Sequence, residues 1–73
     1  MKQKIAFNYS KLRGRIREKC GSDSNFAKKL GCNHGTLSYK LNNISEFSQS
    51  EILKAIRILD IKESEISDYF FAL

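Results

Sequence analysis

The 73-residue sequence predicts one compact, all-α domain of five helices, and three observations lead to that fold class. Apolar residues recur at intervals of three and four along most of the chain, which is the period of a half-buried helix. The chain contains no proline and no Gly/Ser-rich linker, so nothing divides residues 1–73 into two domains. Residues 23–42 have the spacing of two short helices joined by a sharp turn.

The first helix is expected from about residue 8 or 9 to residue 19, behind a flexible N-terminal arm formed by residues 1–7. Leu12 and Ile16 lie four residues apart and form its apolar stripe. Gly14 costs this helix about 1 kcal/mol relative to alanine. We therefore expect another element to approach the backbone closely at this glycine.

Two short helices follow, over about residues 24–30 and 34–41, and particular residues predict how they are joined. Gly31 stands where the chain must leave the first of them with positive φ, which glycine does without a steric clash. Asn33 is a good N-cap for the second helix, and the small Ala27 lets the two helices cross closely. The other apolar residues of the pair are Phe26, Leu30, Cys32, Leu37 and Leu41.

The last two helices are predicted by a capping motif and by apolar spacing. Residues 48–51, SQSE, match a capping box, in which Ser48 and Glu51 exchange hydrogen bonds at a helix start. Core residues then recur at i, i+4 and i+7 as Ile52, Ile56 and Leu59. A fifth helix, over about residues 63–71, contributes Ile66, Tyr69 and Phe70.

Charge is spread unevenly along the chain, whose net charge is +5. Residues 1–45 contain ten Lys/Arg and two Asp/Glu, a balance of +8, whereas residues 46–73 contain three and six, a balance of −3. A basic half joined to an acidic half suggests one surface for a polyanion and another for a different partner. The alternative is a solvated surface whose charge has no partner.

The segment DSNFAKKLGCNHGTLSYKLN resembles the helix-turn-helix of phage repressors and Cro-like transcriptional regulators, because Ala27, Gly31 and Leu37 have that motif's spacing. The resemblance extends over about residues 9–71, and the runs YSKLRGRI, FSQSEI and EISDYFF are similar to one subgroup of short phage regulators. It implies a lambda-repressor-like DNA-binding fold. It also implies a protein that regulates a lysis–lysogeny switch by binding double-stranded operator DNA as a homodimer.

One residue departs from the family's pattern. Many members have an apolar residue where this chain has Lys40, and we expect Leu41 to take over the anchoring role. The rotation of this helix decides which side chains face the bases.

The resemblance also implies which side chains would touch DNA. Those expected to face the bases are His34, Gly35, Thr36, Ser38 and Tyr39, with Lys40 near the rim. Those expected to hold phosphates are Asn33, Ser24, Asn25, Lys28, Asn42 and Asn43. No exposed base-facing residue is Arg, Gln or Asn, the side chains that make bidentate contacts to bases.

This weak reading surface leaves a second function open, which small regulators of phage switches also perform: binding the opposing repressor as an antirepressor. The acidic half and the aromatic tail suit a basic repressor domain. Three consecutive aromatics cannot all face one small core, because successive helical residues point about 100° apart. A protein interface is therefore expected near the C-terminus, with Phe71 and Leu73 as its exposed members. The candidate residues are Tyr69, Phe70, Phe71 and Leu73.

Other classes of function find no support in the sequence. Cys20, Cys32 and His34 offer only three soft ligands, so neither a metal site nor a cofactor is expected. The chain has no nucleophile motif and no phosphate-cradling loop, which argues against an enzyme with a small-molecule substrate. No apolar run is long enough to span a membrane, and MKQKIAFNYS lacks the apolar core of a secretory signal. We therefore expect a cytoplasmic protein of a bacterial host cell.

Overall fold

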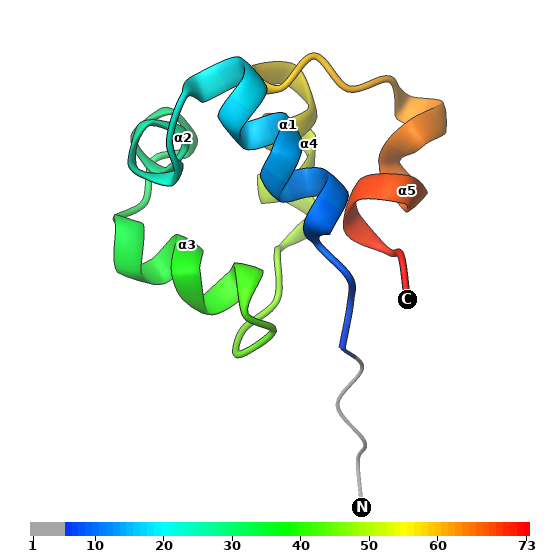
Figure 1. Cartoon of the computed structure of the whole chain (residues 1–73), viewed down its shortest axis with the longest axis horizontal. Coiled ribbons are helices and arrows are strands. Elements are labelled where there is room, and N and C mark those ends of the chain that lie inside the picture. The colour runs from blue at the N-terminus through cyan, green and yellow to red at the C-terminus, as the bar shows by residue number, and fades with distance from the viewer. Residues whose placement is uncertain (1–5) are drawn as a thin grey trace, which may run out of the picture.

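The computed structural model describes residues 6–73 and is all-helical, as predicted. Its five α-helices are α1 (Ser10–Cys20), α2 (Asp23–Leu30), α3 (His34–Leu41), α4 (Gln49–Ile58) and α5 (Ile66–Phe70). The predicted fifth helix is divided, because its first residues form the 3₁₀ helix η1 (Glu63–Glu65). Figure 1 shows α1 crossing the middle of the molecule, with α2 and α3 on one side and α5 on the other.

Side-chain caps fix the starts of three helices. The hydroxyl of Ser22 accepts a hydrogen bond from the Asn25 amide at the start of α2. The side chain of Asn33 accepts one from the Thr36 amide, 2.7 Å away, at the start of α3. The predicted capping box of α4, made by Ser48 and Glu51, is also present. Each cap satisfies an amide that has no partner within its own helix.

The two glycines singled out by the sequence behave differently. Gly31 ends α2 with φ of 91°, in the left-handed region, as predicted. The expectation of a close approach at Gly14 is wrong, because a Cβ built there would meet nothing within 4 Å. Gly14 lies on the exposed face of α1, so it weakens the helix and relieves no contact.

One core lies between the helices. α1 packs on both α2 and α5, and α2 packs on both α3 and α4. Leu37 and Leu41 anchor α3 in this core, as predicted. The largest fully buried side chains are Phe26, Phe70, Leu12, Ile16, Leu37 and Leu59.

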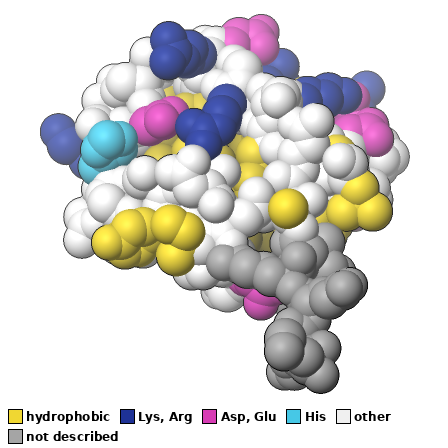
Figure 2. Space-filling model, turned by 60° about the horizontal axis from the view of Figure 1, so that its bottom comes forward, with side chains coloured by type: hydrophobic (Ala, Val, Ile, Leu, Met, Phe, Trp, Pro, Cys, Tyr) yellow, Lys and Arg dark blue, Asp and Glu magenta, His cyan; other side chains and the backbone are white. Residues whose placement is uncertain are grey.

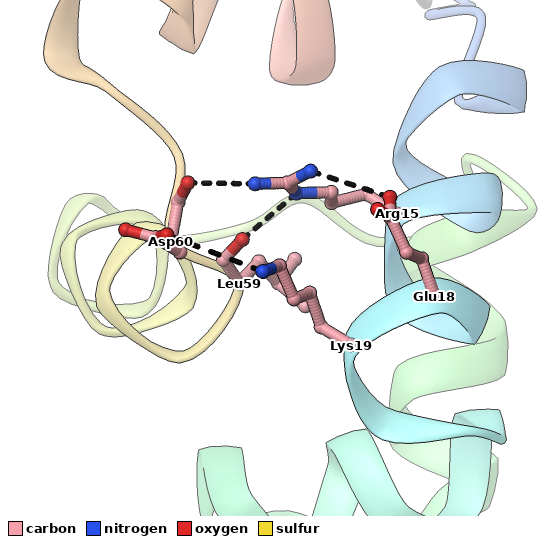
Figure 3. A network of polar contacts seen from close by, with 5 residues as sticks. All are labelled: Arg15, Glu18, Lys19, Leu59 and Asp60. Atoms are coloured by element: carbon pink, nitrogen blue, oxygen red, sulfur yellow. Dashed lines mark hydrogen bonds and ion pairs between the residues drawn. The ribbon is translucent and has the colours of Figure 1, made fainter.

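Arg15 joins α1 to the end of α4 (Figure 3). Its Nε donates to the carbonyl of Leu59 and its Nη2 to that of Asp60, each over 2.8 Å. Nη1 pairs with Glu18 at 3.2 Å, and Lys19 approaches the Asp60 carboxylate at 4.0 Å. The guanidinium thus satisfies carbonyls at the C-terminus of α4, where the helix dipole favours a positive charge.

The end of the predicted N-terminal arm is packed on the domain. The amide side chain of Asn43 accepts a hydrogen bond from the Phe7 N–H and donates one to the Phe7 carbonyl, both over 2.9 Å. The Phe7 ring packs against the rings of Tyr9 and Phe71. Phe7 therefore does not belong to a free arm, and residues 1–5 of the predicted arm lie outside the described residues.

Candidate interaction surface around α3

The turn between α2 and α3 places the start of α3 at the surface. His34, Gly35 and Tyr39 are exposed, and Thr36 and Ser38 are half-buried. The residues predicted to face the bases therefore lie on α3 with three of them exposed to solvent, and their contact with DNA stays a prediction.

Lys40 lies in a different place from the one predicted. It was expected near the rim of the reading surface, but only 8% of its surface is exposed. Its Nζ donates to the carbonyl of Glu46 over 2.9 Å and pairs with Glu51 Oε1 at 3.0 Å. The reason is the rotation of α3, which buries Lys40 together with Leu37 and Leu41 on the inward face of the helix.

The partner of Lys40 is the carboxylate of the α4 capping box. Glu51 also accepts a hydrogen bond from the Ser48 amide over 2.7 Å, and its own amide donates to the Ser48 hydroxyl. Burial alone would raise the pKa of Glu51, but the hydrogen bonds from Ser48 and Lys40 outweigh it and hold the pKa below its ordinary value. One carboxylate therefore caps α4 and neutralises the lysine of α3.

Five of the eight Lys/Arg side chains in residues 6–45 have hydrogen-bond or ion-pair partners in the described chain. Arg13 donates to the carbonyl of Leu41 at the end of α3, and Arg15 to the end of α4. Lys11 pairs with Asp68 at 3.8 Å and lies over the Tyr69 ring. Within residues 6–45, the Lys/Arg side chains with no hydrogen-bond or ion-pair partner in the described chain are Arg17, Lys28 and Lys29.

The predicted phosphate-binding asparagines are also occupied. The side-chain Nδ2 of Asn25 donates to the Cys20 carbonyl. The side chain of Asn42 accepts a hydrogen bond from Arg13 and donates one to the Ser38 hydroxyl. Both polar atoms of the half-buried Asn43 side chain bond to Phe7, so this asparagine has a structural role in holding the N-terminal segment. Of the remaining predicted phosphate ligands, Asn33 caps α3, while Ser24 and Lys28 are exposed.

Two apolar side chains are exposed beside the predicted reading residues. Tyr39 is 58% exposed and Ile44, in the turn after α3, is 59% exposed. The Tyr39 carbonyl accepts hydrogen bonds from the amides of Ile44 and Ser45, so the turn folds back onto α3. Figure 2 shows the face that carries the single histidine, with exposed apolar side chains close to it. Ile44 was missed by sequence reasoning, although an isolated apolar residue within the turn signal NNIS was the clue.

The C-terminal aromatics divide into two kinds. Tyr69 and Phe70 are buried in the core, which corrects their assignment as interface residues. Phe70 fills the space beside Phe47, with ring centroids 5.4 Å apart. Phe71 and Leu73 are exposed, as predicted, and Phe71 lines an open apolar groove with Gln49, Ile52 and Leu53.

No helix within residues 6–73 is both long and apolar enough to cross a membrane. The two cysteines are free thiols: Cys20 is buried and Cys32 half-buried.

Comparison with known proteins places these features in a family. The family described as "Protein of unknown function (DUF739)" matches residues 5–72. Among solved structures, the chain is similar to the solution structure of the modulator of repression (MOR) of the temperate bacteriophage TP901-1 from Lactococcus lactis. The two are 41% identical, the match covers 92% of this chain and 90% of that one, and the TM-score is 0.77. No curated protein matches the chain.

The five-helix fold and this similarity define the class: the chain is a small phage regulatory protein. It belongs to the DUF739 family. Neither match supports the Cro-like repressor family suggested by the sequence resemblance, so only the coarser part of that expectation, a phage regulator, is established.

Proposed function

We propose that this chain modulates a phage switch by binding the repressor protein, which is the antirepressor function considered in the sequence analysis. The 41% identity to a modulator of repression supports a role of this kind. The observation that carries the proposal is the character of the α3 surface. Between Leu30 and Leu53 the only Lys or Arg is Lys40, and it is buried and paired.

None of the exposed residues of α3 and of the turn after it is Lys or Arg, while the neighbouring Arg13 and Lys54 donate to carbonyls at the ends of α3 and α2. Such a helix is poorly suited to DNA, because phosphate neutralisation supplies a large share of the affinity of DNA-binding proteins. It is better suited to a protein partner. Burying Tyr39 and Ile44 removes apolar area from water, at roughly 25 cal/mol per Å², and aromatic anchors of this kind dominate many protein interfaces.

The test uses a candidate repressor from the same genome, sought first in the gene next to that of this chain, together with the DNA that flanks the gene. Calorimetric titration should show a complex of the two proteins in the absence of DNA. In a gel shift, the chain should alter the complex between repressor and operator, and alone it should bind flanking and random DNA equally weakly. Selective binding of the flanking DNA by the chain alone, with no protein complex in the titration, would contradict the proposal.

A second candidate is the operator-binding function that the sequence resemblance implies, with the chain acting as a homodimer. One observation favours it: Arg17, Lys28 and Lys29 are exposed and have no acidic partner in the described residues. If these three cations each neutralised a phosphate, affinity would fall with salt with a log–log slope of about −3 per chain. Replacing Lys28 by methionine would then shallow the slope by about one unit.

In either case the chain acts as a binding protein and not as an enzyme, in the cytoplasm of the bacterial host, where both repressor and operator are found.

A further inference from the structure

We propose that buried Lys40 is a positioning residue, which holds the turn after α3 so that Tyr39 and Ile44 form a preformed docking surface for an apolar, non-acidic patch of the repressor. The inference rests on the proposed function for the identity of the partner. The positioning role rests on the contacts of Lys40 alone.

The side chain of Lys40 contacts residues that follow the turn in the sequence. Its Nζ is 2.9 Å from the Glu46 carbonyl, 3.0 Å from the Glu51 carboxylate and 5.8 Å from the centre of the Phe47 ring. The turn itself, residues 42–45, lies between Lys40 and these groups in the chain. The lysine therefore joins the last turn of α3 to the segment that enters α4, and it closes the turn.

The backbone of the turn is bonded to the residue before the lysine. The Tyr39 carbonyl accepts from the Ile44 amide over 2.8 Å and from the Ser45 amide over 3.3 Å. Asn43 makes the reversal possible with φ of 63°, a left-handed conformation that asparagine tolerates. Tyr39 and Ile44 are thus held in one hydrogen-bonded unit, and more than half of each remains exposed.

The charges around this unit define what it can bind. Within residues 41–50 the only charged side chain is that of the exposed Glu46, and Lys40 and Glu51 neutralise each other beneath the turn. Arg13 of α1 also reaches the end of α3, where its guanidinium donates to the Leu41 carbonyl and to the Asn42 side chain. The turn itself therefore presents apolar side chains and one carboxylate, which fits a partner patch that is apolar and has no acidic group next to Glu46. Docking would cost little ordering entropy, because hydrogen bonds already order the turn in the free chain.

The experiment compares two variants in the full chain. Lys40→Met combined with Glu51→Gln removes the ion pair without leaving a buried charge alone, and glutamine can still accept from Ser48. The matched control is Lys11→Met, which likewise removes an ion pair and a contact of the lysine with an aromatic ring, between α1 and α5. Both are tested for amide hydrogen exchange at Ile44 and Ser45 and for affinity to the neighbouring repressor.

In the double variant the Ile44 amide should exchange about ten-fold faster than in the parent, and repressor affinity should fall about ten-fold or more, while far-ultraviolet dichroism stays native. The control should change neither quantity. Unchanged exchange at Ile44 would overturn the positioning role.

A surface variant, Tyr39→Ala with Ile44→Ser, tests the docking surface directly, because both side chains are exposed and their loss should not unfold the chain. Its repressor affinity should fall by about ten-fold or more, and parental affinity would overturn the docking surface. If the parent chain does not bind the repressor at all, the proposed function fails together with the docking surface, and the exchange measurement still decides the role of Lys40.

Discussion

α1 and α3 use their positive charge in opposite ways. α1 is rich in cations, and four of its five have partners in the described part of the chain, two of them at the C-termini of other helices. α3 has one lysine, which is buried, and the exposed part of the helix carries no Lys or Arg. The cations of α1 are Lys11, Arg13, Arg15, Arg17 and Lys19. The sign of a segment therefore does not show where its charge acts: within residues 6–45, five of the eight Lys/Arg side chains are bonded or paired within the fold.

The physical reason is that helix C-termini leave carbonyl groups without partners and carry partial negative charge. Arg13 reaches the end of α3, Arg15 the end of α4, and Lys54 the carbonyl of Leu30 at the end of α2. Long cationic side chains can satisfy such carbonyls from a neighbouring helix. Charge held in this way attracts a polyanion less, because it is already compensated.

Removing Arg15 should have the largest effect on this comparison. Arg15→Met loses two charge-assisted hydrogen bonds to carbonyls, and we expect a loss of about 2–3 kcal/mol in the free energy of unfolding. The control, Arg17→Met, removes the same charge from the same helix at a solvated position and should stay within about 0.5 kcal/mol of the parent. Urea denaturation measures both. Equal effects would mean that the α1 cations act only through net charge.

The start of α3 gives the next effect. Asn33→Ala removes the side chain that accepts from the Thr36 amide, and it should cost about 1 kcal/mol. Asn33→Asp keeps the acceptor and should remain within a few tenths of a kcal/mol of the parent. If thermal unfolding shows no difference between the two variants, α3 does not depend on its cap, and its position must be fixed by Leu37 and Leu41 alone.

A smaller and opposite effect is expected on the exposed face of α1. Gly14→Ala should raise stability by about 0.5–1 kcal/mol, because alanine loses less backbone entropy in a helix and meets nothing within 4 Å. Gly31→Ala is the contrasting variant and should destabilise the chain, since φ there is 91°. A loss of stability in Gly14→Ala would show that α1 has a neighbour at this position in solution.

The smallest effect concerns acid stability. Because the pKa of Glu51 is lower in the folded chain than in the unfolded one, this carboxyl stabilises the fold at neutral pH. That contribution is present above the unfolded pKa, about 4.3, and it is lost as the pH falls through the lowered folded pKa. Glu51→Gln should therefore show a flatter decline of stability below pH of about 4. A parallel decline in both chains would place the acid sensitivity at other carboxyls.

The features that depend on neighbouring residues in the sequence were predicted correctly. The caps at Asn33 and Ser48, the glycine at Gly31 and the spacing of apolar residues are each set within one or two turns of helix, and the structure confirms them. The 3₁₀ start of the last helix was not predicted, because no residue signal separates it from an α-helical turn.

The candidate site could be predicted only in part, because its electrostatics depend on residues far apart in sequence. Arg15 bonds to carbonyls 44 and 45 positions away, which no charge count along the chain reveals. Lys40 was expected near the rim of the reading surface from the family resemblance, and its burial depends on Glu51, which pairs with it from α4. The weakness of the reading surface for DNA was visible in the sequence, since it follows from residue types alone.

The start of the described chain, at Phe7 and Asn8, is hydrogen-bonded to residues far along the sequence. Phe7 is bonded to the side chain of Asn43, and the next amide, that of Asn8, donates to the Ala72 carbonyl over 2.7 Å. The two terminal segments of the domain therefore already meet, so a short linker joining them would add little loop-closure entropy. A circularly permuted chain should keep the core when opened in a surface turn such as residues 21–22. The same permutation opened at residues 42–45 would separate Tyr39 from Ile44 while leaving every helix covalently intact.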